Sequence, residues 1–205
     1  MPRRRYFCCI DPPILQNLDS LLELDKELLL FFNGLHAPWL DTVMLLATET
    51  FFWTPLYVIL LWLMIRAHRW NTLLLLMGIA LTITLSDQLT STFMKPFFAR
   101  PRPSHEPSLS GLLHLVNGYK GGPYGFASSH AANTFGVALF LYLLFRKNYT
   151  WAPAIFLWAT VVSYTRIYLG VHYPADIMVG ALVGIACGLF AYFCTQQIKK
   201  RFIQT

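Results

Sequence analysis

Long apolar runs constrain the fold of this chain more than any other feature of its sequence. The run from Thr72 to Met94 is long enough to cross a bilayer, which takes about 20 residues of helix. Four further runs are predicted to form spans: Phe51–Ile65, Ser129–Phe145, Trp151–Leu169 and Pro174–Cys194. The sequence therefore predicts an all-α fold, a polytopic membrane helix bundle of about five to six transmembrane helices with an N-terminal interfacial helix.

The composition supports a membrane protein. Of the 205 residues, 56% are hydrophobic and 13% are charged, whereas roughly a quarter are charged in a soluble domain. The net charge of +6 comes from cations beside the apolar runs. This placement favours lipid headgroups or substrate phosphates as partners over nucleic acid. We expect one membrane-embedded domain over 1–205, with an amphipathic, interfacial part at 1–50 and a transmembrane core at 51–197.

The N-terminal part is predicted to lie on the membrane surface. Leucines at helical spacing alternate with acidic residues from Leu18 to Phe32, which is typical of an interfacial amphipathic helix. Asn33-Gly34 should end it, and Pro38–Thr50 should form a second helical piece. Because the Phe51–Ile65 run is short for a span, we expect the first transmembrane helix to begin near Leu45.

The basic residues predict an orientation. Two short turns, at Arg66/Arg69 and Arg146/Lys147, and the C-terminal Lys199-Lys200-Arg201 belong on the cytoplasmic side. The long polar loop 95–127 and the stretch 166–176 then share the opposite, outer face of a bacterial inner membrane. Asp87, in the second half of its span, is expected to be either a structural hydrogen-bonding group or a support for the site, because an acid at that depth must face protein or water.

Three polar clusters fall on this outer face. His172 and Asp176, four residues apart around a helix-opening Pro174, suit a nucleophile and the group that orients it. Arg166 should lie beside them across a short turn. A buried histidine paired with an acid would look the same in isolation, so the other two clusters decide the interpretation.

The second and third clusters supply an anion site. Lys95 and Arg102 lie in a proline-rich segment expected not to form a regular helix, and Arg100 lies between them. Ser128 or Ser129 can cap the helix that follows, and His130 enters its first turn. The free N–H groups at such a helix start bind anions, and a histidine there can donate a proton. Together the clusters indicate phosphoryl transfer.

At these residues the chain resembles the type 2 phosphatidic acid phosphatase superfamily, whose signatures are Lys-x6-Arg-Pro, Pro-Ser-Gly-His and Ser-Arg-x5-His-x3-Asp. The departures are Ala127, Ser129 and Thr165, none at a charged or imidazole position. The matching segments are Lys95 with Arg102-Pro103, Ala127-Ser128-Ser129-His130, and Thr165-Arg166 with His172 and Asp176.

The resemblance implies roles for these residues. His172 would attack phosphorus to give a phosphohistidine, Asp176 would fix the ring, and His130 would protonate the leaving oxygen and then activate water. The phosphate would be held by Lys95, Arg102, Arg166, Ser128 and the N–H of Ser129. The resemblance implies no cofactor and no metal. Cys8, Cys9, Cys187 and Cys194 also lack metal-site spacing and are interpreted as structural or incidental.

Several substrates fit this resemblance. Undecaprenyl pyrophosphate is favoured because the chain is small and shows nothing beyond the core, while phosphatidylglycerol phosphate, phosphatidic acid and lipid A 1-phosphate are alternatives. A lipid phosphotransferase is the enzymatic alternative. A lipid-binding protein without catalysis would need only the cations, so His172, His130 and Asp176 argue against it.

Overall fold

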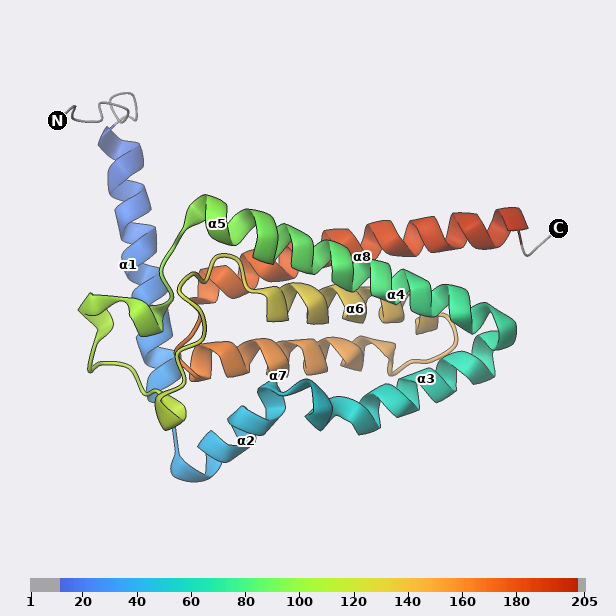
Figure 1. The fold of residues 1–205 in the computed structure, drawn as a ribbon, viewed down its shortest axis with the longest axis horizontal. Coiled ribbons are helices and arrows are strands. Elements are labelled where there is room, and N and C mark those ends of the chain that lie inside the picture. Colours follow the sequence, from blue (N-terminus) through green and yellow to red (C-terminus); the bar gives the residue numbers. More distant parts are fainter. Residues whose placement is uncertain (1–11, 203–205) are drawn as a thin grey trace.

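The computed structural model describes residues 12–202, and within them the chain is helical, with no β-strand. The all-α prediction is confirmed. Figure 1 shows α3, α4, α6, α7 and α8 running along the long axis, while α1 stands across the end that carries the long loop. The helices are α1 Pro12–Gly34, α2 Pro38–Thr48, α3 Thr54–His68, α4 Thr72–Asp87, α5 Lys95–Phe98, α6 Ser129–Phe145, α7 Ile155–Tyr168 and α8 Pro174–Phe202.

Two stretches qualify as membrane spans by length and hydropathy, Thr50–Phe98 and Pro174–Arg201. The first folds back on itself at the Arg69–Asn71 turn, so it contributes both α3 and α4 to the bundle (Figure 1). The pair Gln16–Gly34 and Pro38–Thr48, bent by 114°, is a third candidate, and Ser129–Phe145 is a shorter apolar helix. The exposed apolar side chains on these helices suit contact with lipid.

A stripe of small residues holds α8 against α6. Gly180, Gly184 and Gly188 lie four residues apart on α8, and a Cβ atom at these positions would collide with backbone carbonyl oxygens of Ser128, Ala132 and Gly136. In lipid, such small residues let two helices approach to backbone contact. The contact also joins the starts of both helices, because the Ser128 N–H donates to the Asp176 carbonyl oxygen at 3.0 Å. Packing of α6 on α8 therefore sets the positions of two site segments.

The first predicted span begins later than expected. Instead of a helix from near Leu45, α2 ends at Thr48, Glu49 is extended (φ −80°, ψ 133°), and a 3₁₀ turn precedes α3 at Thr54. Pro55 in the first turn of α3 accounts for the new start, since proline suits that position. The Trp53 indole N–H, which donates to the Ala47 carbonyl at 2.9 Å, holds the corner.

The sequence predicts that the prolines keep residues 95–103 from forming a helix, and this prediction is wrong for the first part of the segment. A π-helical stretch, Gln88–Met94, continues α4 into α5, Lys95–Phe98. Pro96 lies in the first turn of α5, where its missing N–H costs little. The helix ends at Ala99, which adopts a left-handed conformation with φ 45°. The segment from Arg100 onward is therefore free to bend toward the bundle.

Two of the four cysteines lie in α8. Cys187 is buried and Cys194 is partly buried, and both are free thiols. Cys8 and Cys9 lie outside the described residues. Among residues 12–202, no group of three or more His, Cys, Asp or Glu side chains is placed to hold a metal ion.

Candidate active site

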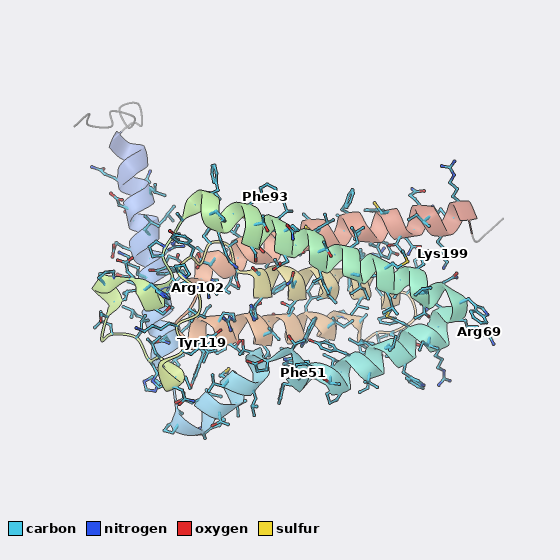
Figure 2. The ribbon with its side chains drawn as sticks, in the orientation of Figure 1. Phe51, Arg69, Phe93, Arg102, Tyr119 and Lys199 are labelled. Atoms are coloured by element: carbon cyan, nitrogen blue, oxygen red, sulfur yellow. The ribbon has the colours of Figure 1, made fainter. Side chains whose placement is uncertain are left out.

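The three clusters predicted from the sequence meet at one end of the bundle. Lys95 comes from α5, Arg102 from the long loop, Arg166 from the end of α7 and His172 from the turn between α7 and α8. His130, in the first turn of α6, lies close enough for the positive charges of Lys95, Arg102 and Arg166 to act on it. Figure 2 shows Arg102 and Tyr119 at this end, and Arg69 and Lys199 at the other.

His172 and Asp176 form a buried pair. Their side chains are 1% and 0% exposed, and His172 Nδ1 lies 3.3 Å from Asp176 Oδ2. The same carboxylate oxygen accepts the backbone N–H of Tyr173 at 3.1 Å. The backbone N–H of His172 donates to the carbonyl of Arg166 at 3.2 Å. These bonds fix both the ring and the turn that carries it, and they leave Nε2 as the ring nitrogen available for chemistry.

Arg100, which sequence spacing set aside in favour of Arg102, binds the other side of this carboxylate. Its Nη1 donates to Asp176 Oδ1 at 2.9 Å, and its Nη2 donates to Asp25 Oδ2 in α1 at 2.7 Å. The second oxygen of Asp25 accepts the N–H of Ala175 at 2.8 Å, and the guanidinium stacks 3.9 Å from the centre of the Tyr173 ring. Arg100 thus holds Asp176 by the oxygen that His172 does not contact, and Asp25 in turn holds Arg100.

Lys95 is anchored through Ser129, the residue that stands where the family signature has glycine. Lys95 Nζ lies 2.7 Å from Ser129 Oγ and 3.3 Å from Ser91 Oγ. Ser91 in turn donates to Asp87 Oδ1 at 3.0 Å. Of the two expectations for Asp87, support for the site fits these contacts, because it holds a side chain that contacts Lys95.

Glycines let the long loop pass close to the catalytic pair. A Cβ atom on Gly125 would lie 3.0 Å from Asp176 Oδ2 and 3.5 Å from His172 Nδ1, so only a residue without a side chain fits easily. Gly121, with φ +65°, approaches Arg102 in the same way. Arg102 is 9% exposed, and its Nε donates to the Tyr124 carbonyl at 3.1 Å. The loop backbone therefore fixes the orientation of the Arg102 guanidinium.

Arg166 is held by two residues that the sequence patterns did not single out. Its Nη1 donates to Thr48 Oγ1 at 2.6 Å and its Nη2 to the Tyr119 hydroxyl at 3.2 Å. The side chain is 2% exposed, and its Nε has no hydrogen-bond partner among the described residues. Thr48 ends α2, so the N-terminal helices contribute directly to the cationic group.

The start of α6 matches the predicted cap. Ser128, rather than Ser129, is the capping residue, and its Oγ accepts the N–H of Ala131 at 3.5 Å. Ser128 is fully buried, whereas the side chain of His130 is exposed at the edge of a cavity. The first turn of α6 therefore presents free N–H groups beside an accessible imidazole.

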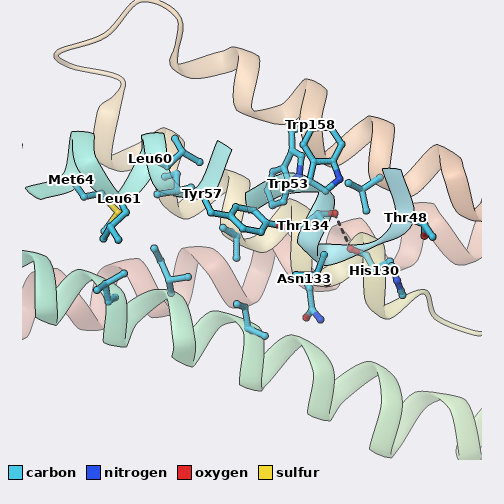
Figure 3. A pocket seen from close by; sticks show the side chains of 17 residues that line it. Thr48, Trp53, Tyr57, Leu60, Leu61, Met64, His130, Asn133, Thr134 and Trp158 are labelled. Atoms are coloured by element: carbon cyan, nitrogen blue, oxygen red, sulfur yellow. Dashed lines mark hydrogen bonds between the residues drawn. The ribbon is translucent and has the colours of Figure 1, made fainter. Parts of the chain in front are cut away.

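That cavity extends the site into the bundle. It has a volume of about 480 Å³ and lies between α3, α4, α6 and α7. Figure 3 shows Thr48, His130, Asn133 and Thr134 toward one end, and Leu60, Leu61 and Met64 toward the other. The Thr134 hydroxyl donates to the His130 carbonyl at 2.8 Å (Figure 3). The cavity is thus polar near the cationic group and apolar away from it.

A family model described as the PAP2 superfamily matches residues 73–200. The chain belongs to this superfamily. A lipid A 4'-phosphatase of Bacteroides thetaiotaomicron is 42% identical over 186 residues, which cover 90% of this chain and 82% of that protein. A putative undecaprenyl-diphosphatase of Escherichia coli, YbjG, is 29% identical over 82% of this chain and 80% of its own.

Among solved structures, Aquifex aeolicus LpxE has a similar fold. It superposes with a TM-score of 0.63 at 29% identity, covering 82% of this chain and 94% of the LpxE chain. The PAP2 match begins at residue 73, so Asp25 and Thr48, which contact Arg100 and Arg166, lie before it. The protein is a membrane phosphatase of the PAP2 type, and two of its site contacts come from its own N-terminal helices.

Proposed function

We propose that this PAP2 protein hydrolyses the 4'-phosphate monoester of lipid A through a phosphohistidine on His172. The single observation that carries the reaction is the buried His172–Asp176 pair beside Lys95, Arg102 and Arg166. A neutral imidazole with its Nδ1 side held by a carboxylate is an activated nucleophile, and three cations offset the charge that develops on a transferring phosphoryl group.

The reaction has two steps. In the first, His172 Nε2 attacks phosphorus, the bond from phosphorus to the lipid oxygen breaks, and His130 donates a proton to that oxygen. In the second, water attacks the phosphohistidine, His130 takes a proton from the water, and the bond from phosphorus to Nε2 breaks. Inorganic phosphate leaves, and both histidines return to their starting states. His130 suits this work because it is exposed at the cavity edge.

We infer a metal-independent reaction, because the three cations would offset the charge on the phosphoryl group that magnesium offsets in kinases. Lys95, Arg102 and Arg166 would bind the phosphoryl oxygens, together with the N–H groups at the start of α6. Ser129 Oγ fixes Lys95 at 2.7 Å and would orient it toward the phosphate. Ser128, buried and capping α6, keeps those N–H groups in place.

Lipid A is proposed as the substrate because the relative that is 42% identical over 90% of this chain is named a lipid A 4'-phosphatase. The undecaprenyl pyrophosphate expected from the small size of the chain is the second candidate, supported by the E. coli relative. Both substrates carry phosphate on an apolar anchor, which the cavity would accept at its Leu60–Met64 end.

The test is phosphate release by the purified protein in detergent with EDTA, from lipid A, undecaprenyl pyrophosphate, phosphatidic acid and phosphatidylglycerol phosphate. We expect release from lipid A that survives EDTA and falls about 10⁴-fold or more in His172→Ala. His105→Ala is the matched control, since His105 is exposed in the long loop, outside the site.

Three results would contradict parts of this proposal. Release that needs added metal would contradict metal independence. Release that persists in His172→Ala would contradict the phosphohistidine. Release confined to undecaprenyl pyrophosphate would move the assignment to the second candidate.

A further inference from the structure

Arg166 is the most buried of the three cations proposed to bind phosphate, and neutral groups hold it. Its side chain is 2% exposed, and it donates to the hydroxyls of Thr48 at 2.6 Å and Tyr119 at 3.2 Å. Within residues 12–202, no carboxylate lies within ion-pair distance of its guanidinium. Arg100 differs, because two carboxylates bind its guanidinium, at 2.7 Å and 2.9 Å.

This difference separates an arginine that supports the fold from one that can bind substrate. Two carboxylates neutralise Arg100, whereas a hydroxyl is a neutral acceptor that fixes the direction of a guanidinium and leaves its charge in place. A buried charge without a partner of opposite sign is costly, and a phosphate beside Arg166 would offset that cost. The two hydroxyls therefore suit a cation whose counter-ion is the substrate.

Both hydroxyls come from points where the chain changes direction. Thr48 is the last residue of α2, and the next residue, Glu49, is extended. Tyr119 follows a 3₁₀ turn in which Asn117 and Gly118 have positive φ values of 52° and 69°, a conformation that asparagine and glycine tolerate best. Arg166 is thus held between the N-terminal helices on one side and the long loop on the other.

We propose that Thr48 and Tyr119 are positioning residues that hold Arg166 toward the phosphate without neutralising it. The inference rests on the proposed function, because it takes Arg166 as a phosphate-binding group. Thr48 also lines the cavity at the end that carries His130 (Figure 3), so this contact borders the space proposed for the substrate. Neither positioning residue belongs to the three motifs, and Thr48 lies before the PAP2 match at 73–200.

The test measures Ki for inorganic phosphate, the product, with the panel lipid that the wild type hydrolyses best. The dephosphorylated lipid is followed by mass spectrometry, so that added phosphate does not interfere. Thr48→Val keeps the shape of the side chain and removes the hydroxyl, and it should raise Ki about tenfold, as expected for one hydrogen bond to a charged group. Thr48→Ser should keep Ki near the wild-type value. Tyr119→Phe should raise Ki about threefold, because its contact is longer and more exposed.

A double-mutant cycle with Arg166→Gln shows whether Thr48 acts through Arg166. Arg166→Gln alone should raise Ki, and adding Thr48→Val should then raise it no further. The matched control is Thr42→Val, at an exposed position of the same helix, which should leave Ki unchanged. A role of Thr48 in folding alone would reduce the amount of active enzyme without changing Ki.

The outcomes separate this inference from the proposed function. An unchanged Ki in Thr48→Val, beside a raised Ki in Arg166→Gln, would overturn the inference and leave the proposed function standing. A tenfold effect of Thr48→Val that persists in the Arg166→Gln protein would also overturn it, since Thr48 would then act by another route. An unchanged Ki in Arg166→Gln would remove Arg166 from the phosphate site and overturn both.

Discussion

The imidazole of His172 is 1% exposed and faces three cations and one carboxylate. Burial, followed by the charges of Arg102, Arg166 and Lys95, lowers the pKa of His172 well below its usual value of 6.5, and a backbone hydrogen bond with Gly125 offsets this only in part. A lowered pKa means that protonation requires a more acidic solution. The nucleophile is therefore neutral, and able to attack, throughout the physiological pH range.

This protonation state gives a testable pH dependence. In the substrate-free protein, the His172 ring should stay neutral as pH falls through 6.5 and should take up a proton only well below that value. Histidine-labelled NMR can follow the titration, with the resonance assigned by its absence in His172→Gln. Arg102→Gln removes the largest of the three cationic contributions to the lowered pKa and should move the midpoint up toward 6.5. A wild-type midpoint at or above 6.5 would contradict this account.

Among the elements, α1 has a role that its amphipathic pattern did not predict. The leucine periodicity of Leu18–Phe32 explains why it is a helix, yet its Asp25 is 7% exposed and paired with Arg100 at 2.7 Å. Through Arg100 and the N–H of Ala175, Asp25 holds both the carboxylate of Asp176 and the start of α8. Asp25 does not contact His172, so we expect it to act by positioning.

Asp25→Asn tests this positioning role. Arg100 would lose one of its two carboxylates and hold Asp176 less firmly, so kcat for phosphate release should fall about 10- to 100-fold, as for other groups that orient a catalytic residue. KM should change little, because Asp25 and Arg100 do not belong to the phosphate-binding cations. Glu27→Gln, at an exposed position on the same helix, is the control. A larger change in KM than in kcat would argue against positioning.

At the scale of the whole molecule, the features that could be predicted from the sequence are those that local patterns encode. The length of the apolar runs indicated the membrane helices, the leucine periodicity indicated α1, and motif spacing selected the residues that meet at the site, including Lys95, His130 and His172. Long-range partners were not predictable, because the hydrogen bond between Asp25 and Ala175 joins residues 150 apart in the chain, and no spacing reports such a contact. The break at Glu49 was missed because the expected helix was extended from Phe51 back to near Leu45 to reach the length of a span, across the polar residues Thr48, Glu49 and Thr50.

The arrangement of charge over the whole bundle predicts its orientation in the membrane. Arg69 and Lys199 lie at the end opposite Arg102 and Tyr119 (Figure 2), and basic short turns favour the cytoplasm. We therefore expect the site to face the periplasm. In a cysteine-free background, a membrane-impermeant maleimide should label Ser110→Cys in intact cells, but Lys147→Cys only after permeabilisation. Both positions are exposed, so accessibility within the fold does not distinguish them, and the reverse labelling pattern would place the site in the cytoplasm.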